Sequence, residues 1–97
     1  MNSLIDRFRI VINMRVAEGY METGNFYIGS DKDDALKVFS ELEGNRKVSS
    51  STLLRLDLIE QTEGIDTLWN SLECSIGEMV DNIRIITKET FRHLNLD

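Results

Sequence analysis

Alternating apolar and polar residues mark the first predicted strand, over residues 7–16. One parity is wholly apolar and consists of Phe8, Ile10, Ile12, Met14 and Val16. The opposite parity is mainly polar and consists of Arg7, Arg9, Val11, Asn13 and Arg15. A period of two is typical of a strand with one buried face. The apolar parity is therefore expected to pack on the core.

A strand and a helix are predicted to follow. The segment 17–25 contains two glycines and is predicted to connect to a short strand at 26–28. Ser30 is the predicted N-cap of a helix over 31–43, because Asp33 stands at capping-box spacing and three aspartates suit the positive helix end. The apolar stripe of this helix is Ala35, Leu36, Phe39 and Leu42. Gly44 stands where a left-handed residue is expected to end the helix.

The second half of the chain has the same order of elements. Leucines alternate with polar residues over 52–61, which predicts a third strand, and Glu63 and Gly64 mark a turn. Residues 65–75 fit either a strand or a helix. A strand is favoured because Ser75 and Glu78 form a capping box that would start a new helix at Ile76. That helix is expected to reach about residue 93, with an apolar stripe of Ile76, Val80, Ile83, Thr87, Phe91 and Leu94.

These elements predict a two-layer α+β fold of ββαββα order, with a mostly antiparallel four-stranded sheet and both helices on one face. The 97 residues suit a single domain over 1–97. The pair Glu18-Gly19 recurs 45 residues later as Glu63-Gly64. A duplication of 7–44 in 53–94 is one explanation, and independent solutions to the same burial problem are the other.

Composition narrows the class of protein. Hydrophobic residues make up 41% of the chain, which is enough for one core. Acidic residues outnumber basic ones by 17 to 11, which excludes a protein whose whole surface binds phosphates. A local basic patch is still compatible with this charge. The start of the chain has charges where a signal peptide is apolar, and no apolar run is long enough to cross a bilayer. A cytoplasmic location without membrane contact is expected.

No pattern of residues selects a catalytic, metal or cofactor site. Cys74 and His93 are the single residues of their kinds, which excludes a Cys/His zinc site within one chain and favours a reducing compartment. About 19 helical positions separate them, or roughly 28 Å, too far for a nucleophile and its base. Cys74 is better explained as a small core residue than as a reactive thiol. The acidic cluster at 31–34 lacks the ligand pattern of a calcium loop. The glycines at 24 and 29 lack the lysine of a phosphate loop.

The sheet face opposite the helices is the candidate binding face. It is expected to present Arg7, Arg9, Arg15, Tyr27, Arg55 and Trp69, provided that Leu68 and Leu72 point inward. Arginine and aromatic residues are enriched in the cores of protein interfaces. The alternative is a solvated face on which the arginines pair with glutamates across strands. If residues 65–75 were helical, the sheet would have three strands and Trp69 would be a core residue.

The sequence therefore favours a non-catalytic interaction domain that forms a homodimer through this open sheet face. A module that binds nucleic acid or a small ligand on the same face is the alternative. The acidic net charge makes nucleic acid the weaker of these partners. No cofactor is expected, and whether the protein is an enzyme stays open.

Overall fold

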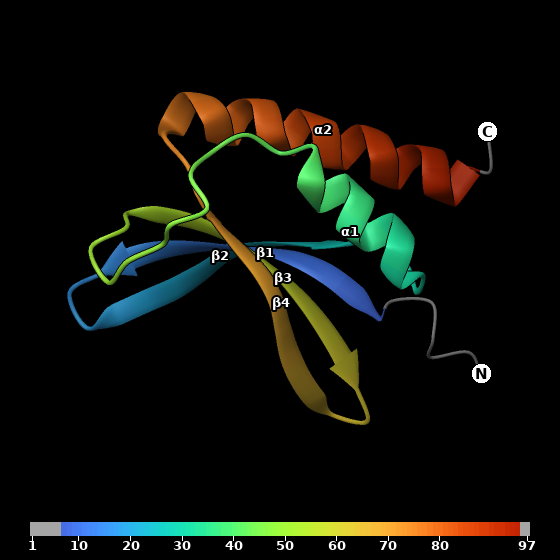
Figure 1. Ribbon diagram of the computed structural model, residues 1–97, viewed down its shortest axis with the longest axis horizontal. Coiled ribbons are helices and arrows are strands. Elements are labelled where there is room, and N and C mark those ends of the chain that lie inside the picture. The colour runs from blue at the N-terminus through green and yellow to red at the C-terminus, as the bar shows by residue number, and fades with distance from the viewer. Residues whose placement is uncertain (1–6, 96–97) are drawn as a thin grey trace.

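Six elements follow one another in the predicted ββαββα order, within the residues that the computed structural model describes, 7–95 for the backbone and 7–92 for the side chains. They are β1 (Phe8–Val16), β2 (Gly19–Tyr27), α1 (Lys32–Ser40), β3 (Leu54–Thr62), β4 (Ile65–Glu73) and α2 (Ile76–Asn95). The strands form one antiparallel sheet in the order β2-β1-β3-β4. Both helices lie on the same side of it (Figure 1), which confirms the predicted fold class.

The core lies between the helices and the central strands. The apolar parity of β1 meets that of β3 in register, with Ile10 opposite Leu58 and Ile12 opposite Leu56. α1 covers this layer with Ala35 and Phe39, both without exposed surface. The alternation in the two central strands thus predicts the buried face correctly, because these strands have neighbours on both sides.

β2 is much longer than predicted. It spans nine residues, and the connection to β1 is only the two-residue turn at 17–18. Its sequence, GYMETGNFY, lacks alternation because β2 is an edge strand that is mostly exposed or half-buried. A register shift opposite Ile12 and Asn13 also changes the parity within the strand. The predicted loop at 17–25 was therefore wrong, because the exposure of this edge strand and its register shift remove the alternation that would identify a strand.

β4 resolves the ambiguity of residues 65–75 in favour of a strand. The turn before it consists of Glu63 and Gly64, which have φ values of 53° and 81°. Two consecutive residues with positive φ are the requirement of a type I′ turn, whose twist suits a two-residue hairpin. The β3–β4 pairing is interrupted by a bulge opposite Leu58 and Ile59. On the two sides of the bulge, residues of opposite parity in β4 therefore face the helices.

The first helix is shorter than predicted at both ends. Its N-cap is Asp31, whose Oδ1 accepts a hydrogen bond from the backbone N–H of Asp34 at 3.1 Å, so the predicted Ser30 cap was one residue early. The helix ends at Ser40. Gly44 lies beyond it with a φ of 146°, and a Cβ there would stand 2.3 Å from the carbonyl oxygen of Glu73. Gly44 thus allows the chain to approach β4 instead of ending the helix.

The second helix begins as predicted, but it is rotated relative to the predicted stripe. Ser75 and Glu78 exchange the two hydrogen bonds of a capping box, at 2.9 and 3.1 Å. The buried side consists of Met79, Asn82 and Ile86, with Ile83 and Ile85 partly buried. Four residues of the predicted stripe are exposed instead: Ile76, Val80, Thr87 and Phe91. The side chains of His93 and Leu94 lie outside the described residues.

Candidate functional site

Four of the six candidate residues lie on the open sheet face as expected, namely Arg9, Arg15, Tyr27 and Arg55. In the sheet, Arg9 of β1 lies between Tyr27 of β2 and Ile59 of β3. Further along the same face, Arg55 of β3 lies opposite Asn13 of β1. No helix covers this face (Figure 1). Its centre is nevertheless closed, because Val11 is only 2% exposed and Asp57 only 4%.

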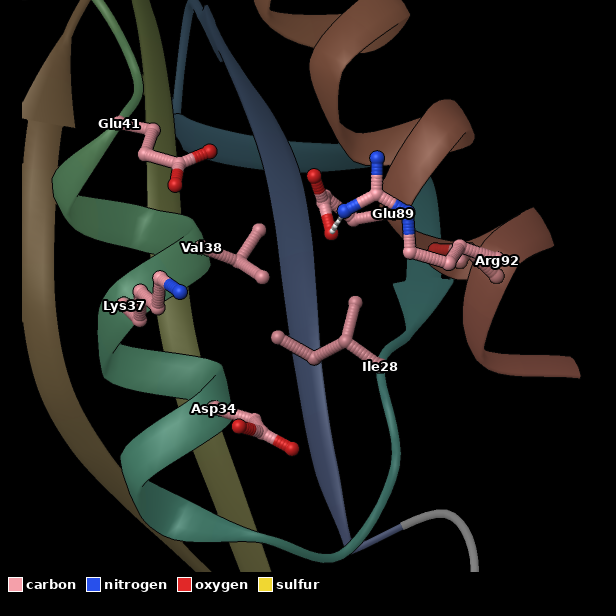
Figure 2. Close-up of a pocket in the computed structure, with 8 residues that line it drawn as sticks. Ile28, Asp34, Lys37, Val38, Glu41, Glu89 and Arg92 are labelled. Atoms are coloured by element: carbon pink, nitrogen blue, oxygen red, sulfur yellow. Dashed lines mark hydrogen bonds and ion pairs between the residues drawn. The ribbon is translucent and has the colours of Figure 1, made fainter. Parts of the chain in front are cut away.

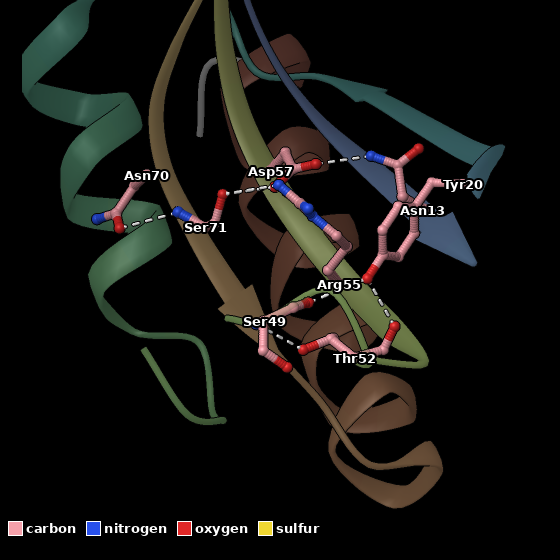
Figure 3. Close-up of polar contacts among 8 residues, drawn as sticks. All are labelled: Asn13, Tyr20, Ser49, Thr52, Arg55, Asp57, Asn70 and Ser71. Atoms are coloured by element: carbon pink, nitrogen blue, oxygen red, sulfur yellow. Dashed lines mark hydrogen bonds and ion pairs between the residues drawn. The ribbon is translucent and has the colours of Figure 1, made fainter. Parts of the chain in front are cut away.

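Asp57 is the centre of a polar network on this face (Figure 3). Its carboxylate accepts hydrogen bonds from the Asn13 amide at 2.6 Å and the Ser71 hydroxyl at 2.6 Å. The Arg55 guanidinium donates two more, at 3.1 Å from Nε and 3.0 Å from Nη2. Three of these bonds end on Oδ1 and one on Oδ2, so both carboxylate oxygens have donors within the chain. The network joins strands β1, β3 and β4 without a second layer of structure.

Tyr20 extends this network to the loop before β3 and was missed in the sequence. Its ring lies under the Arg55 guanidinium, 5.1 Å from ring centroid to Cζ. Its hydroxyl donates to the carbonyl oxygen of Thr52 at 2.8 Å (Figure 3). Tyr20 falls in the segment expected to be a loop, so no strand pattern placed it on this face.

The arginines of the open face are largely occupied within the chain. Arg9 donates to Asp66 at 3.1 Å, and its side chain is only 16% exposed. Arg55 is bound to Asp57. Arg15 is exposed and has no ion pair among residues 7–92. The Arg9–Asp66 pair matches the alternative in which arginines of the face pair across strands, although the carboxylate is an aspartate. Arg55 instead pairs with an aspartate of its own strand.

Trp69 and Arg7 lie elsewhere, so the expectation that they share the open face was wrong. The bulge in β4 places Leu68 opposite Ile59, on the open face, and leaves Trp69 on the helix side. There the Lys32 ammonium stacks on the Trp69 ring, 3.8 Å from the centroid. A one-residue change of parity in a strand transfers every following side chain to the opposite face.

Glu60 joins Trp69 and Arg7. Its carboxylate accepts a hydrogen bond from the Trp69 indole at 2.8 Å and another from the Arg7 Nε. The indole hydrogen bond, together with the hydrogen bonds and charge of Arg7, holds the pKa of Glu60 below its ordinary value of 4.5, although burial acts in the opposite direction. The cluster connects the start of β1 to the β3–β4 hairpin. Each oxygen of the Glu60 carboxylate has a donor within the chain, which favours a structural role.

Cys74 is a core residue. It is 6% exposed, and burial is the main cause that raises the pKa of its thiol above the ordinary value of 9.0. Its sulfur accepts a hydrogen bond from the Asn82 amide at 3.2 Å. A buried thiol that stays protonated at neutral pH is a poor nucleophile.

A cleft between α1 and α2 has a volume of about 220 Å³. Figure 2 shows Ile28 and Val38 in it, with charged side chains of both signs around them. Two of these, Glu89 and Arg92, form an ion pair at 3.4 Å. The mixture of charges selects no anion or cation. The residues that the structure describes contain no group of three or more metal-ligating side chains.

Exposed apolar residues gather at another place, beside α2 and the β1–β2 hairpin. We call this set, Met14, Met21, Leu53, Ile76 and Val80, the apolar edge surface. Met14 lines an apolar groove with Leu53 and Ile76. Met21 pairs with Met14 across the hairpin, and Val80 follows Ile76 by one helical turn. Contiguous exposed apolar patches often mark interaction sites.

Comparison with known proteins returned no match, whether to a family model, to a curated protein or to a solved structure. Within residues 7–95, no helix is long and apolar enough to cross a membrane.

Proposed function

We propose that the protein is a non-catalytic interaction domain that self-associates. The observation that carries this proposal is the apolar edge surface, in which Ile76 and Val80 are 76% and 53% exposed on one side of α2. The sequence expectation of a homodimer is kept, but the contact is assigned to this surface instead of the open sheet face.

The energetics favour a contact that depends on concentration. Complete burial of a large aliphatic side chain contributes about 1.5–3 kcal/mol, so five roughly half-exposed residues contribute about 5 kcal/mol per copy and about 10 per pair. Association costs about 4–15 kcal/mol in lost translational and rotational freedom. Apolar burial alone therefore supports a weak pair, and additional contacts determine its strength.

The open sheet face is less suited to this role. A partner there would have to cover Arg9 and Arg55, which already have carboxylate partners within the chain. Burial of these pairs would remove their remaining hydration without a new opposite charge. The same pairing weakens the case for a nucleic-acid or small-ligand platform, because phosphate contacts need available cationic side chains.

Light scattering over a concentration series tests self-association. The expected molar mass rises from 11.2 kDa for one chain toward twice that value. Trp69 lies beside β3 and the start of α1, so its quenching by acrylamide is expected to stay constant during assembly. A mass of one chain at every concentration would contradict the proposed function. Protection of Trp69 during assembly would place the contact on another surface.

A further inference from the structure

We infer that the apolar edge surface binds a second copy of this chain about a twofold axis perpendicular to the sheet, so that two β2 edges pair and two α2 helices pack antiparallel. This inference rests on the proposed function and adds the partner and the geometry. A single axis of this direction reverses both the strand and the helix, so both contacts form together.

The exposed side of α2 faces away from the rest of the helical layer. Asn82 points toward the segment after α1, where its amide bonds to both the N–H and the carbonyl of Glu43, at 2.7 and 2.8 Å. Val80 and Asn82 are two positions apart, so their side chains point about 200° apart round the helix axis. Val80 is therefore directed away from α1, with Ile76 and Thr87 on the same side.

The edge strand β2 lies beneath this side of α2. β2 ends the sheet order, and α2 packs on β2. One edge of β2 thus has no strand neighbour within the described part of the chain, and such an edge can pair with another chain. Met21 of β2 contributes to the apolar edge surface next to it. A second β2 placed antiparallel would extend the sheet to eight strands, since each copy supplies four.

The charges along α2 select a second copy in antiparallel orientation. Asp81, Arg84 and Lys88 are exposed, follow one another at helical spacings of three and four, and lie on the solvent side of the apolar stripe. None of the three has an ion pair among the side chains that the structure describes. Antiparallel packing centred near Ile83 brings Asp81 of each copy between Arg84 and Lys88 of the other. Parallel packing would place Asp81 against Asp81.

Mixing of two charge-reversed proteins tests this geometry. One protein carries Asp81→Arg, and the other carries Arg84→Glu with Lys88→Glu. Each alone places like charges against each other twice, so its dimer is expected to weaken at least about tenfold. The mixed pair restores opposite charges at both contacts and is expected to recover the wild-type dissociation constant. A mixture that stays as weak as the separate proteins would overturn the antiparallel arrangement.

A matched pair of variants separates this inference from the proposed function. Val80 on α2 and Leu68 on the open sheet face are similarly exposed, at 53% and 54%. Val80→Lys is expected to abolish the dimer, whereas Leu68→Lys leaves it unchanged, and circular dichroism verifies that both fold. Loss of the dimer in Leu68→Lys alone would overturn the inference but keep the self-association. A monomeric wild-type protein would overturn both.

Discussion

Asn82 is the polar residue most completely buried in the core, with no exposed surface. Its amide pairs with Glu43 as one peptide group pairs with another, and it also donates to the Cys74 sulfur. Polar groups can be buried at little net loss when every donor and acceptor is satisfied. Asn82 therefore fixes the rotation of α2 by connecting it to the segment after α1.

Replacement of Asn82 by leucine tests this role. The change removes the acceptor of the Glu43 N–H and leaves the Glu43 carbonyl only the weak thiol donor of Cys74 at 3.5 Å. A polar group that loses its partner costs about 1–3 kcal/mol. We expect the free energy of unfolding to fall by about 2–4 kcal/mol in urea denaturation. Asn70→Leu is the control, because Asn70 is exposed, and it should change stability by less than about 0.5 kcal/mol. Equal stability of the two variants would contradict the role of Asn82.

Glu60 makes the stability of the fold decrease in acid. Its pKa is lower in the folded protein than its ordinary 4.5, chiefly through the Trp69 indole, so the folded state favours the carboxylate. The resulting stability is present above about pH 4.5 and is lost as the pH falls through the folded pKa. Glu60→Gln should therefore lower stability at pH 7 and flatten its decrease in acid, measured by urea denaturation with Trp69 emission. Glu63→Gln, in the exposed turn, should keep the wild-type profile; an unchanged acid profile in Glu60→Gln would contradict the assignment.

At the scale of elements, the sequence predicts the buried face of a strand best where burial alternates with the same period as the apolar residues. β1 and β3 have neighbours on both sides, so their alternation corresponds to buried and open faces. The capping box of Ser75 and Glu78 locates the start of α2, because both hydrogen bonds are local. Local chemistry and regular periods are therefore sufficient for the order of elements and for the fold class.

Features that depend on distant partners could not be predicted in this way. The bulges in the two hairpins change which residues of β2 and β4 face the helices, and no residue pattern in the sequence predicts these bulges. Trp69 was assigned to the wrong face for this reason. The burial of Asn82 could not be predicted, because its partner Glu43 lies 39 positions away in the sequence. The buried side of α2 is rotated relative to the predicted stripe, so that Ile76, Val80 and Phe91 are exposed and Ile83 is partly buried.

The candidate site was predicted in part. Arg9, Tyr27 and Arg55 lie on the open sheet face as the parity of their strands indicates. Arg9 pairs with Asp66 of β4, and this contact depends on strand register, which composition does not determine. Arg55 pairs with Asp57, two positions away in the same strand. The apolar edge surface was missed because its residues come from four segments and because those in α2 were expected to be buried.

At the scale of the whole molecule, the two faces of the sheet are shielded from solvent in different ways. The helices cover one face with apolar side chains, and the network around Asp57 closes the other with hydrogen bonds. The apolar edge surface lies to the side of these two layers, along α2 and the edge strand β2. Growth beyond a pair is not expected, because the twofold contact uses the same α2 and β2 of each copy and is closed.

Hydrogen exchange at the two sheet edges is the most direct test of this account. β2 and β4 are both nine-residue edge strands, so each serves as the reference for the other. The amide exchange of Gly19–Tyr27 should slow as protein concentration rises through the association range, while that of Ile65–Glu73 stays constant. Slower exchange in β4 alone, or equal rates at all concentrations in β2, would contradict self-association through the apolar edge surface.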